Sequence, residues 1–184
     1  DIKGKHLKHV FDGEQLKGLL FGSDASVIKK LSLVQQLILK IGRISQLLRN
    51  VAVLRFLSKV WMPISKKIII IGGDLVGLEL AEFLIERGRK VKVFEPSPSL
   101  GQNLSIVRRS RVVHLLKEHG AELLTNVNIK EISKKGVLYE LAENEHLEES
   151  DQVIIALGTN SNLDLSNSLK NLGIPITSIG DCTS

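Results

Sequence analysis

The stretch "IIIIGGDLVGLELAEFL", from Ile68 to Leu84, decides the fold. Four consecutive isoleucines predict a strand that is covered on both faces. Two glycines then predict a tight turn, and the residues from Leu75 to Arg87 have the apolar spacing of a helix. Free N–H groups at the start of such a helix, together with the helix dipole, form a site for an anion. The stretch therefore predicts the first strand, turn and helix of a dinucleotide-binding domain.

Three further features have the chemistry that a dinucleotide needs. Gly72 permits the tight turn, and Gly77 lets the helix pack closely against the sheet. Glu95 ends the next predicted strand, Lys90–Phe94, where an acid can accept hydrogen bonds from both ribose hydroxyls of an adenosine. The four residues after Glu95 include no arginine that would pair with a 2′-phosphate. This pattern favours NAD(H) over NADP(H).

Asp74 occupies the position of the second motif glycine, which normally lets the backbone approach the diphosphate. A carboxylate about 4 Å from a phosphate charge would cost on the order of 4 kcal/mol at an effective dielectric constant near 20. In a second interpretation Asp74 is the helix N-cap, and its carboxylate takes the N–H groups that a phosphate would use. Both interpretations predict weak nucleotide binding, unless the side chain rotates outward into solvent. We expect Asp74 to weaken the site rather than to abolish it.

Strands and helices alternate along most of the chain, which is typical of a Rossmann-like, doubly wound α/β domain. Further strands are expected within residues 6–12, at 121–124, 128–133 and 137–141, at 151–157 and at 176–179, with turns at "KKG" and "ENEH". A short helix is expected at 13–21 and a longer one from about Ser105 to His119.

A basic helical insert is predicted at residues 24–63. Between residues 24 and 67 nine Lys or Arg stand against one acid, so this segment carries +8 although the whole chain carries only +5. Asp24 is a candidate N-cap, apolar residues recur at helical spacing from Leu31 to Val60, and Pro63 ends the helices. Because the charge is concentrated in one insert, it does not indicate nucleic-acid binding. We expect the apolar stripe to pack on another domain or to form a homodimer rather than to lie on a membrane.

Other features of the composition bound the class of protein. No apolar run reaches the roughly 18 residues that span a bilayer, and no signal peptide leads the chain, so a cytoplasmic setting is expected. Cys182 is the single cysteine and has no partner for a disulfide or a CxxC pair. The five histidines are interpreted as solvated rather than metal-binding or catalytic. Three arginines of "RRSR" are interpreted as an exposed helix face, with adenosine phosphate contacts as the alternative: Arg108, Arg109 and Arg111.

Three ordered motifs resemble one family: the glycine turn up to Glu95, "VIIALGTNSNL" and "SIGDCTS". They resemble the flavin oxidoreductases with two dinucleotide-binding domains, especially the 2,4-dienoyl-CoA reductase and 2-enoate reductase group. The resemblance covers residues 1–23 and 64–184. It implies a parent protein in which an N-terminal barrel holds FMN and an iron–sulfur cluster, and a C-terminal half binds FAD and NAD(P)H. The implied segments are a linker from the FAD half-domain (1–23), the insert (24–63), the NAD(H)-binding domain (64–172) and the start of the returning FAD half-domain (173–184).

Eleven residues are candidates for cofactor binding, and the resemblance assigns a role to seven of them. Gly72, Gly73 and Gly77 match the pyrophosphate turn, Glu95 the ribose acid, Glu79 the acid towards nicotinamide and flavin, Gly158 the glycine where the chain crosses under the cofactor, and Asp181 the acid that bonds the FAD ribityl chain. The other four candidates are the neighbours of these residues: Asp74, Leu75, Val76 and Gly180. The chain departs from the family pattern at Asp74, at Ser161, where proline is usual, and in the insert.

The resemblance implies that this chain delivers hydride from NADH to FAD in an enoate or dienoyl-CoA reductase-like enzyme. It contains no catalytic residue or metal site of its own, would not hold FAD alone, and would be inactive in isolation. One alternative is a pyridine nucleotide–disulfide reductase type of domain. Another is a degenerate scaffold that binds no nucleotide and whose helical insert mediates assembly.

Overall fold

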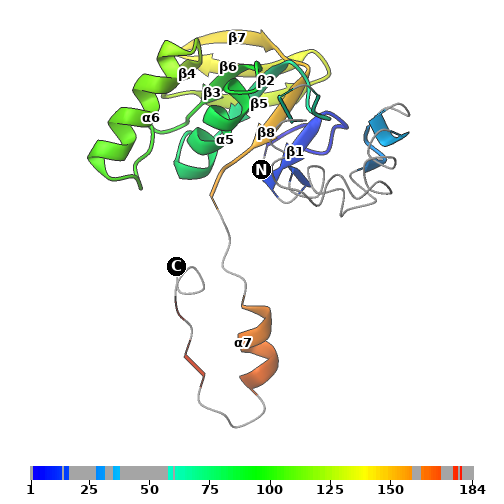
Figure 1. Ribbon diagram of the computed structural model, residues 1–184, viewed down its shortest axis with the longest axis vertical. Coiled ribbons are helices and arrows are strands. Elements are labelled where there is room, and N and C mark those ends of the chain that lie inside the picture. The colour runs from blue at the N-terminus through cyan, green and yellow to red at the C-terminus, as the bar shows by residue number, and fades with distance from the viewer. Residues whose placement is uncertain are drawn as a thin grey trace.

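The computed structural model describes residues 2–13, 15–16, 28–31, 35–37, 58–59, 61–158, 163–170, 176–177 and 179. In the long continuous part, strands and helices alternate from residue 67 to residue 124, and four further strands follow without a helix between them (Figure 1). The strands are β1 (Val10–Asp12), β2 (Lys67–Ile71), β3 (Lys90–Phe94), β4 (Glu122–Leu124), β5 (Asn128–Ser133), β6 (Gly136–Leu141), β7 (Asn144–Glu149) and β8 (Gln152–Ile155). The helices are α5 (Leu75–Ile85), α6 (Ile106–Glu118) and α7 (Asp164–Leu169).

Five of these strands form one parallel sheet in the order β1-β8-β2-β3-β4. The chain leaves β2 through α5 to reach β3 on one side, and it returns to place β8 on the other side of β2. The order of strands therefore reverses at β2, and such a reversal is where open α/β sheets bind ligands, beyond the carboxyl ends of the strands. The remaining three strands form an antiparallel sheet in the order β5-β6-β7.

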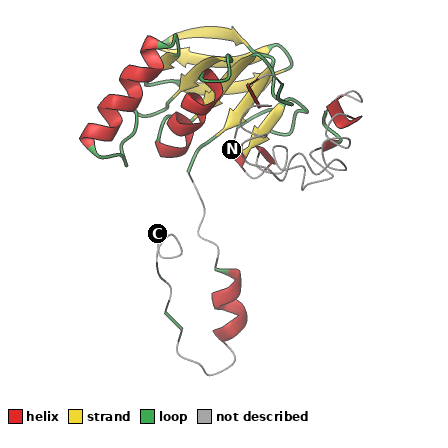
Figure 2. Ribbon diagram, viewed as in Figure 1, coloured by secondary structure: helices red, strands yellow, loops and turns green. Residues whose placement is uncertain are grey.

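The parallel sheet is covered on both faces, as Figure 2 shows by the helices on one side and the second sheet on the other. Alternate residues of β2 belong to different cores, because side chains of a strand point to opposite faces. Ile68 and Ile70 pack with α5 and α6, whereas Ile69 and Ile71 pack with the three-stranded sheet. The predicted doubly wound α/β fold, with a buried strand from the isoleucine run, is confirmed.

Several predicted elements differ in extent or kind. The opening strand is limited to Val10–Asp12, because the chain from residue 4 to residue 9 turns. The predicted turn at "ENEH" is wrong: β7 begins at Asn144, and the turn lies one step earlier, at Ala142 and Glu143, which both have positive φ. The predicted last strand is also wrong at the residues described there, Ile176, Thr177 and Ile179, which lie in no strand. The short helix α7 was not expected.

The insert lies mostly outside the described residues, Asp24 and most of the predicted helix at 13–21 included. Of the residues described in these segments, those at 13, 15–16, 28, 35–37 and 58–59 are helical, whereas those at 29–31 and 61–63 lie in turns, bends or loop. The segment boundaries proposed from the sequence remain predictions. Within the described ranges, no helix is long and apolar enough to cross a bilayer.

Candidate functional site

The glycine turn joins β2 to α5 at the carboxyl edge of the parallel sheet, and close packing fixes its shape. Gly72 has φ +114°, and a Cβ there would lie 2.4 Å from Ala156 O. A Cβ on Gly77, in the first turn of α5, would lie 1.9 Å from Gly72 O. Both positions therefore require glycine, as the sequence predicts, and the helix start is held directly against the turn.

The start of α5 offers backbone donors. Leu78 N–H is the first to bond inside the helix, to Asp74 O at 2.9 Å, so the amides of Leu75, Val76 and Gly77 are the orphan donors of a helix start. Asp74 has the extended backbone of an N-cap, but its side chain makes no cap hydrogen bond. The interpretation that its carboxylate takes these amides is therefore wrong.

The Asp74 carboxylate turns instead to Asn103, in the loop between β3 and α6. Its Oδ1 accepts the backbone N–H of Asn103 at 3.1 Å, and its Oδ2 accepts the Asn103 side-chain amide. The carboxylate thus points away from the α5 amides, as in the outward rotation considered from the sequence, but toward Asn103 rather than into open solvent. Sequence reasoning missed Asn103, because it lies 29 residues from Asp74 and has no motif of its own.

Glu95 lies at the end of β3 beside the turn. Its Oε2 accepts the backbone N–H of Gly73 at 2.5 Å, and its Oε1 accepts that of Ser97 at 2.8 Å. The acid therefore ties the glycine turn to the loop that follows β3. Each carboxylate oxygen has a second lone pair, so the group still fits ribose hydroxyls as acceptor.

Residues 100–105 lie against the turn from the other side. Gly101 N–H donates to Gly73 O at 2.7 Å, and the buried Leu100 fills the space that a Cβ on Gly73 would occupy, 2.4 Å from its Cδ2. The loop is thereby fixed to the turn by backbone and by apolar packing. The sequence does not predict this contact.

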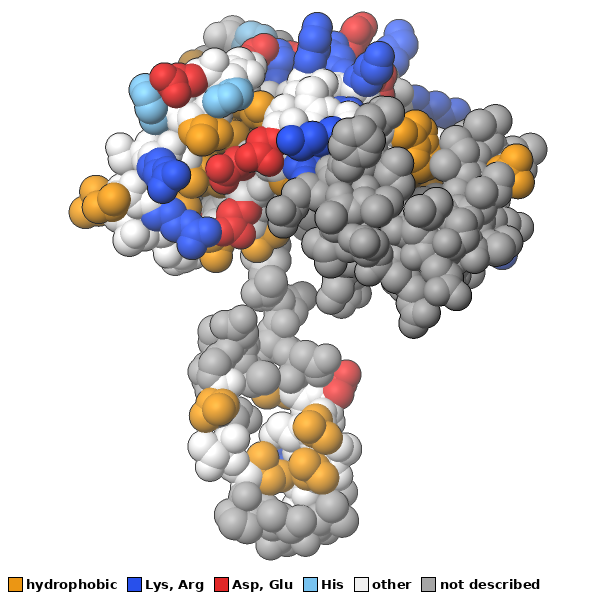
Figure 3. Space-filling view, in the orientation of Figure 1, with side chains coloured by type: hydrophobic (Ala, Val, Ile, Leu, Met, Phe, Trp, Pro, Cys, Tyr) orange, Lys and Arg blue, Asp and Glu red, His pale blue; other side chains and the backbone are white. Residues whose placement is uncertain are grey.

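Glu79 lies on α5, and its carboxylate forms an ion pair with the Arg108 guanidinium of α6. Both side chains are about half exposed. Figure 3 shows acidic and basic side chains close together over α5 and α6. Arg108 is thus a partner of an acid near the turn, and the role of Glu79 towards nicotinamide and flavin remains a prediction.

A groove of about 530 Å³ opens between α6 and the loop after β3. Pro98 forms part of one wall, and the basic side chains Arg109, His114 and Lys117 line the other. A Cβ on Gly101 would contact Arg109 Cγ at 3.4 Å, so the aliphatic part of the Arg109 side chain lies close to the loop that follows Glu95. No arginine follows Glu95 in the next few residues, but the fold brings one near.

Gly158 follows β8 with φ +61°, and its chain segment passes the turn, since Gly72 contacts Ala156 and Leu157 there. Three apolar side chains at this edge are exposed: Leu75 (36%), Val76 (52%) and Leu157 (45%). Exposed apolar side chains gathered at one edge are typical of a surface that another domain or a ligand covers. The remaining site candidates, Gly180 and Asp181, lie outside the described residues, as do Ser161 and Cys182.

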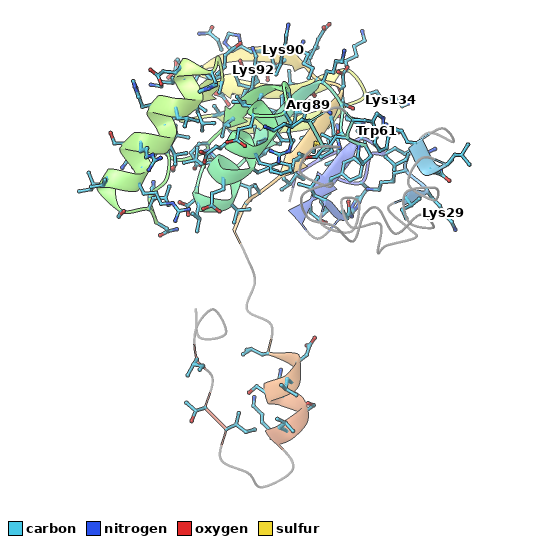
Figure 4. All side chains as sticks on the ribbon, viewed as in Figure 1. Lys29, Trp61, Arg89, Lys90, Lys92 and Lys134 are labelled. Carbon is cyan, nitrogen blue, oxygen red and sulfur yellow. The ribbon has the colours of Figure 1, made fainter. Side chains whose placement is uncertain are left out.

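Two groups with displaced pKa, Lys92 and His9, contact the three-stranded sheet. Burial lowers the pKa of Lys92, but its hydrogen bonds to Glu122 (2.7 Å) and Glu148 (2.9 Å) outweigh this and raise the pKa above the ordinary value. Figure 4 labels Lys92, which links β3 to β4 and to β7. Burial also lowers the pKa of His9, against a hydrogen bond with the Ser133 backbone. In the described part of the chain, no three His, Cys, Asp or Glu side chains form a candidate metal site.

Comparisons with known proteins agree with this geometry. Residues 41–182 match the family model described as pyridine nucleotide-disulphide oxidoreductase. The match includes the glycine turn, both strands that flank it, and the segment after β8. The chain therefore belongs to the pyridine nucleotide-disulphide oxidoreductase family, whose members bind FAD and NAD(P).

Individual relatives are oxidoreductases. The chain is 31% identical over 118 residues to a bilirubin reductase of Mediterraneibacter gnavus (64% of this chain, 18% of the relative). It is 30% identical over 109 residues to a dihydrolipoyl dehydrogenase of Acholeplasma laidlawii (59% of this chain, 32% of the relative). A solved structure of a 2-naphthoyl-CoA reductase in complex with 2-naphthoyl-CoA matches with a TM-score of 0.61 and 27% identity, over 65% of this chain and 18% of that one. The chain thus spans between about a fifth and a third of the length of these proteins.

Proposed function

We propose that this member of the family binds NADH at the carboxyl end of β2 and presents it to FAD within a larger flavoprotein. NADH, when bound, supplies a hydride. The residues of this chain bind and orient it: the amides of Leu75 to Gly77 hold the diphosphate, and Glu95 holds the adenosine ribose. The observation that carries the proposal is that these amides are left free by Asp74, whose carboxylate bonds to Asn103 instead.

The choice of NADH over NADPH rests on Glu95. A carboxylate at the end of β3 accepts ribose hydroxyls but repels a 2′-phosphate. Arg109 in the nearby groove argues in the other direction, because a guanidinium pairs with phosphate. Titration with both nucleotides decides between them, and we expect the tighter binding for NADH.

We further propose that the parent protein is an enoate or dienoyl-CoA reductase-like enzyme, with FAD, FMN and an iron–sulfur cluster outside this chain. The similarity to 2-naphthoyl-CoA reductase supports this, since its structure was obtained with an aromatic acyl-CoA. The exposed Leu75, Val76 and Leu157 then face the FAD domain of the same protein, which would be cytoplasmic. In this proposal residues 173–184, with Gly180 and Asp181, return to that FAD domain.

A second candidate is a disulfide reductase type of enzyme. The description of the family and the similarity to dihydrolipoyl dehydrogenase support it as well as the first. The two differ in the final acceptor and not in the NADH site. Assay of the larger protein with NADH and either an enoyl-CoA or a disulfide such as lipoamide separates them by which compound is reduced.

Isothermal titration of the chain with NADH tests the proposal. The Asp74→Gly variant should bind about tenfold more tightly, because it removes a negative charge that is partly screened by solvent near the diphosphate. Glu86→Gln is the matched control, since it removes an exposed acid at the far end of α5 and should leave the affinity unchanged. Absence of heat with NADH and NADPH in both the natural chain and Asp74→Gly would instead favour a scaffold that binds no nucleotide.

A further inference from the structure

Because Asp74 stands at the N-cap of α5, the direction of its side chain decides whether the first amides of the helix remain available to a ligand. An aspartate at an N-cap with extended backbone normally accepts the N–H of the second or third helical residue, here Val76 or Gly77. Those are two of the amides that an anionic ligand would use. In the structure both carboxylate oxygens are bonded to Asn103, and no cap bond forms.

Asn103 itself is held in place without its side chain. Two backbone bonds fix its loop, from Gly101 N–H to Gly73 O at 2.7 Å and from Leu104 N–H to Gly101 O at 3.1 Å. The buried Leu100 anchors the same loop against the turn. Asn103 contacts Asp74 through both its backbone N–H and its side-chain amide. A substitution of Asn103 keeps the backbone contact and removes only the side-chain contact.

We propose that Asn103 is a positioning residue that holds the Asp74 carboxylate clear of the α5 amides and so keeps them available for the diphosphate of a pyridine nucleotide. This inference rests on the proposed function for its ligand, but the side-chain arrangement stands independently of it. Asn103 compensates for the acid at the motif glycine position. Without the side-chain amide, Asp74 gains the freedom to cap its own helix and to compete with the ligand.

Asn103→Ala, combined with Asp74→Gly, tests this coupling. In the natural background Asn103→Ala should weaken NADH binding by about tenfold, the loss expected when a capping carboxylate competes for the same donors. In the Asp74→Gly background the same substitution should leave the affinity unchanged, because no carboxylate remains to be held. Equal weakening in both backgrounds, or none in either, would overturn the proposal, since Asn103 would then act only on the loop or not at all.

A second measurement needs no ligand. Amide hydrogen exchange by NMR should show Val76 and Gly77 exchanging more slowly in Asn103→Ala, because Asp74 then accepts their hydrogens, and unchanged in the double variant. If NADH binds to no variant but this protection appears, the proposed function fails while the role of Asn103 stands. If NADH binds and no protection appears, the proposal for Asn103 is overturned.

The matched control is Asn128→Ala. Asn128 also donates its side-chain amide to a carboxylate, Glu140 Oε2 at 3.0 Å, on the three-stranded sheet. Its removal should change neither the NADH affinity nor the exchange of the α5 amides. Asn103→Gln, which keeps the amide group on a longer side chain, should restore part of the affinity lost in Asn103→Ala.

Discussion

Gly77→Ala should damage both the fold and the site, and the structure gives the size of the effect. The added Cβ would lie 1.9 Å from Gly72 O and 2.9 Å from the carbonyl carbon, whereas real Cβ atoms essentially never approach closer than 3.0 Å. Gly72 is held in place, because its N–H bonds to Phe94 O at 2.8 Å and the backbone of Ala156 packs directly against it. The start of α5 must therefore move away from the sheet by about 1 Å.

This displacement loosens the packing of α5, whose Leu78, Ala81 and Leu84 are fully buried. Overpacking of a closed site costs up to about 3 kcal/mol, and alanine recovers about 1 kcal/mol of helix propensity relative to glycine. We expect a net loss of about 2 kcal/mol in the free energy of unfolding. The NADH affinity should fall as well, because the displaced amides belong to the proposed diphosphate site.

Urea unfolding followed by circular dichroism measures the stability, and calorimetry measures NADH binding. Gly13→Ala is the matched control: nothing lies within 4 Å of its added Cβ, so its effect should remain within about 0.5 kcal/mol. If Gly77→Ala unfolds at the same urea concentration as the natural chain and binds NADH equally well, close contact between helix and turn is not what requires glycine here.

Four further substitutions test other contacts of the structure. Glu95→Ala should weaken NADH binding roughly tenfold and cost about 1–3 kcal/mol of stability, because two backbone N–H groups lose their acceptor; an unchanged calorimetric titration would remove Glu95 from the site. Lys92→Met should cost about 1 kcal/mol at neutral pH, because Glu122 and Glu148 both lose the hydrogen bond from its ammonium group. Since the pKa of Lys92 is raised above 10.5, the difference from the natural chain in unfolding experiments should persist at neutral pH and vanish only as the pH rises through the raised value. Gly73→Ala should destabilise the chain because its Cβ meets the flexible end of Leu100, and Leu100→Ala should relieve part of that cost; purely additive losses in thermal unfolding would contradict the contact.

The sequence predicts the parallel sheet and the glycine turn well, because their signals are local. A run of isoleucines, two glycines and a helical pattern lie within a few residues of one another, and Glu95 follows at the next strand end. The turn and helix are confirmed almost to the residue, with α5 ending at Ile85 rather than at Arg87. Such elements depend little on the rest of the chain.

The missed elements lack local signals. The strand β7, "NEHLEE", is mostly exposed and highly charged, so it has neither an apolar run nor a clear alternation. Its hairpin turn uses Ala142 and Glu143 at positive φ, where glycine or asparagine would have marked it. Conversely, the apolar residues Ile176 and Ile179 predict a strand, yet both side chains are exposed.

The effect of Asp74 is harder to predict from the sequence, because the residue that sets the direction of its carboxylate, Asn103, lies 29 residues away along the chain. The segment after β3 supplies three contacts to the turn and α5: Gly101 and Asn103 of the loop bond to the Gly73 carbonyl and to Asp74, and Arg108 in the first turn of α6 pairs with Glu79. Two of the three bind an acid of the turn or of α5, the helix whose first amides form the proposed diphosphate site. An acid in place of a motif glycine therefore cannot be judged by its charge alone, because the cost depends on where the carboxylate points. Here the loop after the second strand of the nucleotide-binding unit sets that direction, and a substitution in this loop should change nucleotide affinity as much as one in the glycine turn.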